Sequence, residues 1–174
     1  MNEENKNDFR IQLATREDLG AINALFRDVI EDINTVKKLS MWNSEYPFCE
    51  FENDINKGEM YSIEFGDKTI GSFVLNEFDD PYYADIQWTT DDKKWFTINR
   101  LVILPTEQGK GYAKRAMDFI EDYAAKNKYE AIRLTVYKDN VYAIGLYEKY
   151  GFKKIEDCHC IIEGRELWGF EKEV

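Results

Sequence analysis

The sequence contains no long hydrophobic run. Hydrophobic residues make up 44% of its 174 residues, but their uninterrupted runs extend over only a few positions. A helix that crosses a bilayer needs about 20 consecutive apolar residues, so a membrane span is excluded. The first ten residues, MNEENKNDFR, also lack the apolar core of a signal peptide. We therefore expect a flexible segment over residues 1–8 and a single domain over residues 9–174.

Cysteine and histidine are scarce. The three cysteines, Cys49, Cys158 and Cys160, are odd in number and form no CxxC pair. This argues against a disulfide framework and favours a reducing cytoplasm. The single histidine, His159, lies between two of the cysteines. Neighbouring side chains of a strand point to opposite faces, so these three side chains cannot converge on one ion, and we expect no metal site.

Basic residues are outnumbered by acidic ones. The chain has 23 lysines and arginines against 34 aspartates and glutamates, for a net charge of −11. This balance argues against a nucleic-acid partner, because the phosphate backbone requires a basic face. It suits a cationic small molecule or a lysine-rich peptide, although most acidic surfaces are only solvated. We expect neither a nucleic acid nor a membrane as partner.

Hydrophobic periodicity predicts a single α/β domain. Alternating apolar residues predict strands over residues 9–14, 60–65, 69–78, 95–104 and 131–137, and two more around Glu163 and Gly164. Helical spacing predicts helices after an N-cap at Thr15, before Gly58, over residues 109–126 and over residues 140–150. The predicted order is βααβββαβαββ, antiparallel at first and with a strand–helix–strand unit in the middle.

A glycine-rich basic segment, LPTEQGKGYAKRAM, covers residues 104–117. Pro105 ends a buried strand, and Gly109 opens the predicted helix. The start of a helix has four N–H groups without internal partners and a partial positive charge, which favour a bound anion. Gly109 and Gly111 allow the backbone to approach a ligand closely. The segment predicts a phosphate site with three nearby cations, Lys110, Lys114 and Arg115; the alternative is a tight turn with solvated side chains.

Two common phosphate motifs do not fit this segment. A P-loop requires GxxxxGK followed by serine or threonine, which GKGYAKRA does not supply. A dinucleotide fingerprint requires glycine or alanine where Lys114 stands. Glu130 lies about twenty residues beyond, as that fingerprint asks, but it precedes a strand instead of ending one. A nicotinamide-binding enzyme is therefore disfavoured.

Two motifs resemble the GNAT superfamily of N-acetyltransferases. QGKGYA at residues 108–113 is similar to the family signature (Gln/Arg)-x-x-Gly-x-(Gly/Ala) at the start of the helix after the fourth strand. Asn140 and LYEKYGF at residues 146–152 are similar to the second landmark of the family. The resemblance extends from about residue 9 to the end and includes the element order. It implies a GNAT-type fold: a mixed, mostly antiparallel central sheet flanked by helices.

The resemblance also implies acetyl-coenzyme A as co-substrate, in a gap between the strand ending at Leu104 and the strand over residues 131–137. Backbone groups of three residues in the strand ending at Leu104 would pair with the pantetheine arm: Leu101, Val102 and Ile103. N–H groups of the glycine segment would hold the pyrophosphate: Gln108, Gly109, Lys110, Gly111, Tyr112 and Ala113. The following helix would contribute Asn140, Ala143, Tyr147 and Lys149. An exposed strand amide would stabilise the oxyanion that develops on attack.

Tyr147 is the predicted general acid, because the tyrosine at this position of the family points its hydroxyl at the coenzyme sulfur. The ordinary pKa values are roughly 10 for tyrosine and 8.5 for a thiol, so proton transfer from Tyr147 to the thiolate is not strongly favoured. The alternative is that Tyr147 only donates a hydrogen bond to the sulfur. Many relatives place a glutamate base on the fourth strand, where this chain has Thr97 and Asn99. Glu77 is the best remaining carboxylate. Ordered water or an amine that arrives neutral is equally compatible.

Aromatic and acidic residues outside the motifs are candidates for the acceptor site: Trp42, Tyr46, Tyr82, Tyr83 and Trp88, with Asp79, Asp80 and Asp85. Such rings can surround an amine, although they can equally belong to the core. We predict transfer of an acetyl group to a primary amine of a small molecule, by direct attack in a ternary complex. The alternatives are a protein N-terminal or lysine acetyltransferase and a non-catalytic acetyl-CoA-binding module. Family habit predicts a homodimer; the sequence names neither the amine nor the base.

Overall fold

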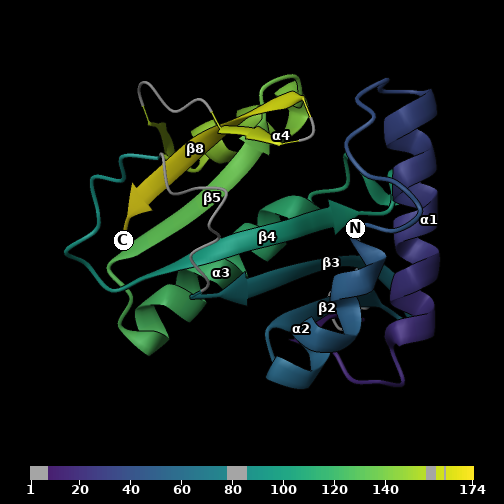
Figure 1. Ribbon diagram of the computed structural model, residues 1–174. Coiled ribbons are helices and arrows are strands. Elements are labelled where there is room, and N and C mark those ends of the chain that lie inside the picture. The colour runs from purple at the N-terminus through teal and green to yellow at the C-terminus, as the bar shows by residue number, and fades with distance from the viewer. Residues whose placement is uncertain (1–7, 78–85, 156–159, 163) are drawn as a thin grey trace. The chain divides into compact units, whose positions relative to one another are not determined.

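The computed structural model describes residues 8–77, 86–155, 160–162 and 164–174 (Figure 1). The strands are β1 (Phe9–Leu13), β2 (Met60–Phe65), β3 (Lys68–Asn76), β4 (Trp95–Ile103), β5 (Ala131–Tyr137), β6 (Lys153–Lys154), β7 (Cys160–Ile162) and β8 (Arg165–Glu173). The helices are α1 (Leu19–Thr35), α2 (Phe51–Lys57), α3 (Tyr112–Asn127) and α4 (Val141–Lys149), with short 3₁₀ turns at Phe48–Glu50 and Pro105–Glu107. None of these helices is both long enough and apolar enough to span a bilayer.

The sheet has the strand order β1-β2-β3-β4-β5-β8-β6, and β7 pairs with β8. β1 with β2, β2 with β3, and β8 with β5, β6 and β7 are antiparallel. β4 and β5 are parallel, because α3 connects them as a crossover helix. The predicted α/β class and the mixed, mostly antiparallel sheet are confirmed.

The chain forms two compact units. The first unit comprises Met1–Leu75 and Arg100–Phe119, and the second comprises Asn76–Asn99 and Ile120–Val174. β4 and α3 each contribute residues to both units. The first unit therefore contains the glycine segment, and the second contains α4.

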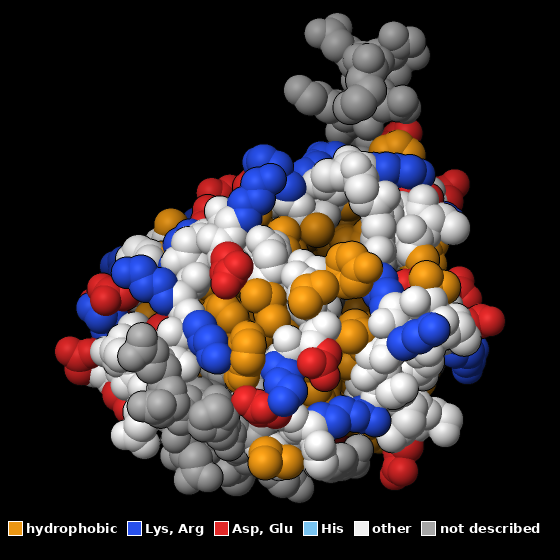
Figure 2. Space-filling view, turned by 90° about the horizontal axis from the view of Figure 1, so that it is seen from above, with side chains coloured by type: hydrophobic (Ala, Val, Ile, Leu, Met, Phe, Trp, Pro, Cys, Tyr) orange, Lys and Arg blue, Asp and Glu red, His pale blue; other side chains and the backbone are white. Residues whose placement is uncertain are grey.

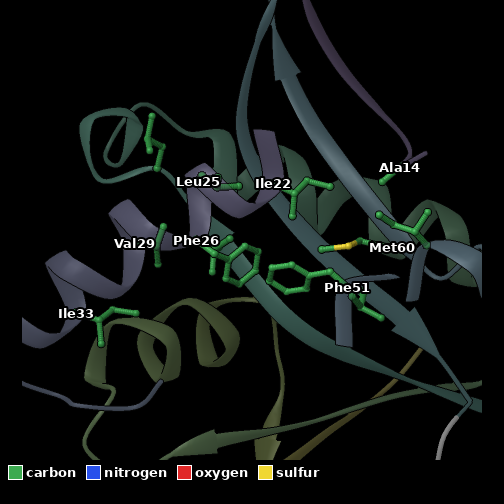
Figure 3. Packing of buried hydrophobic residues seen from close by; sticks show 12 residues of the cluster. Ala14, Ile22, Leu25, Phe26, Val29, Ile33, Phe51 and Met60 are labelled. Carbon is green, nitrogen blue, oxygen red and sulfur yellow. The ribbon is translucent and has the colours of Figure 1, made fainter. Parts of the chain in front are cut away.

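The core of the first unit is built on α1. Its apolar residues recur at helical spacing, so Ile22, Phe26 and Val29 are buried on one face. The Phe26 ring lies 4.6 Å from the Phe51 ring of α2, and Figure 3 shows these side chains pointing toward each other. The Phe26 ring also lies 5.6 Å from the ring of Trp42. Of the two roles that the sequence left open for Trp42, packing against the core is the one observed.

Within the second unit, Arg133 of β5 holds the segment that precedes β4. This side chain of β5 is only 2% exposed. Its guanidinium carbon lies 4.9 Å from the Trp88 ring centre and 4.6 Å from that of Trp95. Its Nη2 donates to Asp91 over 2.8 Å, and its Nε donates to Thr90 over 2.9 Å. The Trp88 ring therefore lies against the guanidinium of Arg133, and its predicted contact with an acceptor amine stays a prediction.

Two predicted helix starts are corrected. Thr15 is not the N-cap of α1, which begins at Leu19 with Asp18 as its N-cap. The Asp18 carboxylate instead accepts hydrogen bonds from the Thr15 N–H and hydroxyl over 2.7 and 2.9 Å, which closes a turn ahead of the helix. α3 begins at Tyr112 and not at Gly109, because Gly109 and Gly111 have left-handed φ angles of 78° and 87°. A right-handed helix cannot include those angles.

The remaining elements follow the prediction closely, with one omission. β2 and β5 have the predicted bounds, and Gly58 ends α2 with a φ of 69°. The two-residue strand β6 was not predicted, because so short a segment carries no periodicity. Cys158, His159 and Glu163 lie outside the described residues.

Candidate functional site

The loop after β4 requires its two glycines because of their backbone conformation. A Cβ atom added to Gly109 or Gly111 would meet no other atom within 4 Å, so neither position is crowded. Both residues have φ angles that L-residues rarely adopt. The two glycines therefore let the chain turn from the 3₁₀ segment Pro105–Glu107 into α3.

A row of unbonded N–H groups lies at the start of α3. The five consecutive N–H groups of residues 109–113 donate no hydrogen bond to any group in the part of the chain that the structure describes. The N–H of Arg115 is bonded within the turn, to the Gly111 carbonyl over 3.2 Å. α3 continues for 16 residues, which gives these donors the full partial positive charge of a helix terminus. The arrangement is suited to bind an anion such as phosphate.

Gln108 supports this loop from one side. Its side-chain Nε2 donates to the Ile103 carbonyl at the end of β4 over 2.9 Å. Its Oε1 accepts from Lys37 Nζ, just beyond α1, over 3.2 Å. Its own N–H already donates to the Pro105 carbonyl over 3.3 Å. Gln108, predicted to contribute an N–H group, therefore holds the loop against β4 through its side chain.

The basic side chains of the loop all have partners. Lys110 Nζ lies 2.9 Å from Glu107, and Lys114 Nζ lies 2.8 Å from Asp118. Arg115 lies over the Phe9 ring at 3.5 Å from its centre. The predicted positive spot is thus compensated by carboxylates just outside it. Attraction of an anion rests mainly on the backbone N–H groups and the helix dipole.

Charges of both signs are mixed on the surface. Figure 2 shows lysine and arginine side chains next to aspartate and glutamate side chains across the face it displays. The net charge of −11 is therefore not gathered into an acidic patch on that face. The displayed face therefore has no concentrated acidic region that would attract cations.

β4 contains a left-handed residue immediately before Leu101. Arg100 has a φ of 52°, which is costly for a residue other than glycine and requires support from its surroundings. Its Nη2 lies 2.5 Å from Asp54 of α2, and its Nη1 donates to the Tyr46 hydroxyl over 3.3 Å. Burial raises the pKa of the Asp54 carboxyl, whereas the Arg100 guanidinium acts in the opposite direction. The side chain of Arg100 is thus held by two residues of the first unit, at the position that precedes residues 101–103.

The parallel ladder between β4 and β5 is short. It consists of three residue pairs, from Trp95–Ala131 to Thr97–Arg133. Ile98 and Asn99, which continue β4 within the second unit, have no partner in β5. The backbone groups of Ile98 and Asn99 on the β5 side of β4 therefore form no ladder hydrogen bonds with β5.

Tyr147 of α4 is a buried residue whose hydroxyl has no partner among the described residues. The residue is 7% exposed, and its ring lies 5.6 Å from that of Phe152. Its hydroxyl makes no hydrogen bond to the described residues, and it is not one of their buried polar atoms without a partner. Burial raises the pKa of this hydroxyl above its ordinary value of 10.0, so it stays protonated at neutral pH.

The other predicted residues of α4 are placed at its two ends. Asn140 is the N-cap: its Oδ1 accepts from the Ala143 N–H over 3.2 Å. This hydrogen bond brings Asn140 and Ala143 together and gives Asn140 a structural role besides the predicted ligand contact. Lys149 is exposed in the last turn.

Glu77, the predicted carboxylate base, is bonded to a tyrosine. Its Oε1 accepts from the Tyr129 hydroxyl over 2.5 Å. The Tyr129 ring lies 4.7 Å from that of Phe96, so the carboxylate lies on the Phe96 side of β4. Thr97, the next residue of the strand, points to the opposite side. Glu77 as general base stays a prediction, but its carboxylate is engaged away from Thr97.

The comparisons with known proteins agree with these features. Residues 26–152 match the model of the acetyltransferase (GNAT) family. The chain belongs to this family. It is therefore an N-acetyltransferase, as the sequence led us to expect.

Solved GNAT acetyltransferases share the fold. One from Streptococcus agalactiae 2603 is 18% identical with a TM-score of 0.76, over 97% of this chain and 96% of that one. The PaiA N-acetyltransferase from Thermoplasma acidophilum, in complex with coenzyme A, is 16% identical with a TM-score of 0.71, over 95% and 99%. Spermidine N-acetyltransferase from Vibrio cholerae, in complex with CoA and spermine, is 21% identical with a TM-score of 0.63, over 95% of each chain.

Sequence reasoning missed two polar groups of this acetyltransferase. The pair of Asp54 and Arg100 joins residues 46 positions apart, and the only available signal was an arginine inside the apolar segment WFTINRLVIL. The second group comprises Asn76, Thr97 and Asn99 and is described below. Several candidates for the acceptor site lie outside the described residues: Asp79, Asp80, Tyr82, Tyr83 and Asp85.

Proposed function

We propose that the protein transfers the acetyl group of acetyl-CoA to a primary amine of a small molecule, by direct attack in a ternary complex. The observation that carries the proposal is the row of five unbonded N–H groups over residues 109–113. Helix termini with such donors bind phosphate oxygens without needing basic side chains. Acetyl-CoA is the acetyl donor of the acetyltransferase family to which the chain belongs.

Most of the residues proposed to bind the coenzyme belong to the first unit. In the first unit, the N–H groups of Gly109, Lys110, Gly111, Tyr112 and Ala113 bind the pyrophosphate, with Gln108 as support. Backbone groups of Leu101, Val102 and Ile103 bind the pantetheine arm. In the second unit the proposed residues are Asn140, Ala143, Tyr147 and Lys149. Two solved relatives of this fold contain CoA, which supports the assignment.

Tyr147 is the proposed proton donor. Acetyl-CoA supplies an activated thioester, whose sulfur leaves as a thiolate when the carbon–nitrogen bond forms. The Tyr147 hydroxyl is protonated and free of competing hydrogen bonds from the described residues. It donates a hydrogen bond or the proton itself to that sulfur. An amine that arrives as ammonium first gives its extra proton to ordered water or to Glu77, a step that an amine arriving neutral does not need. In either case the nitrogen releases one proton after attack, and this proton balances the one that the leaving thiolate takes up.

A small amine is favoured as acceptor by one relative of the same fold. The Vibrio cholerae structure is of a spermidine N-acetyltransferase with spermine bound. The net charge of −11 is compatible with such a polycation. The cytoplasmic location, the homodimer and the absence of a nucleic-acid partner stay predictions from the sequence.

The first experiment is a thermal-shift titration with acetyl-CoA, CoA, NADH and ATP. A ligand at one hundred times its dissociation constant adds about 2.7 kcal/mol of stability. We expect acetyl-CoA and CoA to stabilise the protein and NADH and ATP to have no effect. Stabilisation by NADH or ATP alone would contradict the coenzyme assignment.

The second experiment is a thiol-release assay with acetyl-CoA and three amines: spermidine, n-butylamine and an amino-acid ester. Release that depends on the amine supports transfer to small molecules. Label that passes from isotopic acetyl-CoA into proteins of a lysate, with no transfer to the three amines, would favour a protein acetyltransferase. Coenzyme binding without hydrolysis or transfer would favour a non-catalytic module.

A further inference from the structure

Three uncharged side chains form a hydrogen-bond network in the second unit. Thr97 Oγ1 lies 2.6 Å from Asn76 Oδ1 and 3.1 Å from the Asn76 carbonyl oxygen. Asn99 Nδ2 lies 3.1 Å from Asn76 Oδ1 and 2.9 Å from Thr97 Oγ1. All three residues are half-buried. The network lies on the side of β4 opposite Phe96, and no side chain in it is charged.

The distances determine how the Asn99 amide is oriented. A separation of 2.6 Å is short for an N–H···O bond and ordinary for an O–H···O bond. The Asn76 atom that faces Thr97 is therefore its side-chain oxygen. The Asn99 atom close to that oxygen must be a donor, because two amide oxygens would repel each other. Both hydrogens of the Asn99 amide are then used within the network, and its Oδ1 points away from it.

The Asn99 oxygen is an oriented acceptor without a partner among the described residues. It accepts no hydrogen bond from them, and it is not one of their buried polar atoms without a partner. An ordinary surface asparagine can rotate its amide to present a donor or an acceptor. Here two hydrogen bonds to half-buried partners hold the oxygen outward on a rigid strand. A ligand that reaches this point must offer a donor.

We infer that Asn99 Oδ1 accepts a hydrogen bond from the acceptor amine and positions its nitrogen for attack. The inference rests on the proposed function and names the residue that binds the amine. Asn99 precedes by two residues the stretch of β4, starting at Leu101, that we propose for the pantetheine arm. A neutral primary amine has two N–H groups, so it donates one to Asn99 and keeps its lone pair available.

The absence of charge at this site has a consequence for pH dependence. An amide oxygen does not take up a proton at neutral pH and forms no ion pair with an ammonium ion. The amine therefore reacts in its neutral form, and its proton passes to solvent before attack. The value of kcat/KM for the amine rises with pH until the pKa of the amine itself is reached.

The test compares N99L and N99D with the wild type, using spermidine and n-butylamine as probes. N99L removes the acceptor, so the KM for either amine rises by about tenfold, whereas the KM for acetyl-CoA is unchanged. N99D has the same size but lacks the Nδ2 donor, so Thr97 and a turned Asn76 amide must donate to its carboxylate instead. Its charge favours the ammonium form and can accept its proton. We expect the rise of kcat/KM with pH to begin at lower pH in N99D.

Matched controls are N127L and N127D. Asn127 is an exposed residue at the end of α3, and its side chain donates to the Tyr123 carbonyl over 2.9 Å. Both control variants keep the wild-type KM values and the wild-type pH profile. The melting temperature of every variant is measured as well. If N99L does not fold, the isosteric N99D carries the test through its pH profile.

The inference and the proposed function fail in different ways. Unchanged KM values for the amines in N99L, together with an unshifted pH profile in N99D, overturn the inference and leave the acetyltransferase reaction intact. A wild type that neither binds acetyl-CoA nor acetylates any of the amines overturns the proposed function and the inference with it. A tenfold effect confined to the KM for acetyl-CoA would assign Asn99 to the coenzyme instead and would overturn the inference.

Discussion

Arg100 and Asp54 form a buried ion pair that bridges β4 and α2. Their Nη2 and Oδ2 atoms lie 2.5 Å apart, and the side chains are 11% and 4% exposed. The Nε of Arg100 is buried without a hydrogen-bond partner, so its guanidinium depends on few contacts. The same residue has the left-handed φ of 52°. One side-chain contact thus supports both a buried charge and a strained backbone.

Removal of Asp54 is expected to destabilise the protein strongly. In D54A, Arg100 is left as an uncompensated buried charge, which costs about 3–5 kcal/mol of unfolding free energy. The measurement is urea denaturation followed by circular dichroism. D118A breaks the exposed pair with Lys114 and serves as the control, with little change in the midpoint expected. Equal midpoints for the two variants would show that the buried pair contributes no more to the free energy of unfolding than the exposed pair.

Replacement of Gly111 is expected to weaken coenzyme binding. Its φ of 87° would place any other L-residue in a left-handed conformation that costs about 1–2 kcal/mol. G111V relieves this strain by moving the N–H groups at the start of α3, so the dissociation constant for CoA rises by about tenfold. Isothermal titration calorimetry measures it. G20A, in the open helix position of α1, keeps the wild-type affinity; equal affinities in both variants would contradict the loop as the phosphate site.

Loss of the Tyr147 hydroxyl is expected to lower kcat without unfolding the protein. In Y147F the ring packing against Phe152 is retained, and no hydrogen bond to the described residues is broken. Steady-state kinetics with saturating substrates would show a fall of about 10²-fold, as for loss of a general acid. A melting temperature close to that of the wild type is the accompanying control. A kcat unchanged from the wild type would remove Tyr147 from the mechanism.

The titration of Tyr147 also predicts the alkaline part of the pH profile. Burial raises the folded-state pKa above the ordinary value of 10.0, so the hydroxyl remains protonated up to and beyond that pH. Any stability linked to this group is complete below pH 10 and is lost only as pH rises through the raised value. We expect no loss of kcat below pH 10 that disappears in Y147F. A descending limb there, absent from the variant, would show that the pKa is not raised.

The hydrogen bond between Glu77 and Tyr129 argues against the predicted role of Glu77 as a base, and E77Q tests that role. The Glu77 carboxylate is bonded to Tyr129 on the Phe96 side of β4, away from Thr97 and Asn99. E77Q keeps its carbonyl oxygen available to that hydroxyl, so the acid limb of the pH–rate profile stays where it is in the wild type. A shift of that limb in E77Q, at unchanged melting temperature, would restore Glu77 as the general base.

Much of the fold follows from local patterns. The spacing of apolar residues in α1 and the alternation in β5 depend only on the period of each element. Gly111 in the sequence indicates a left-handed backbone angle at that position, because few other residues adopt one. The start of α3 was nevertheless misplaced at Gly109, since a helical pattern does not show where the φ angle changes sign.

The linear chain was enough to identify the acetyltransferase family, the glycine loop and Tyr147, because each is contained in a short motif whose geometry is local. Tertiary contacts alone determined what surrounds them. Arg100 meets Asp54, Trp88 covers Arg133, and the amide of Asn99 is oriented by Asn76. These partners lie far apart in the sequence, and a side chain's charge or hydrogen-bonding group does not specify which distant residue will satisfy it. That choice depends on how strands and helices pack.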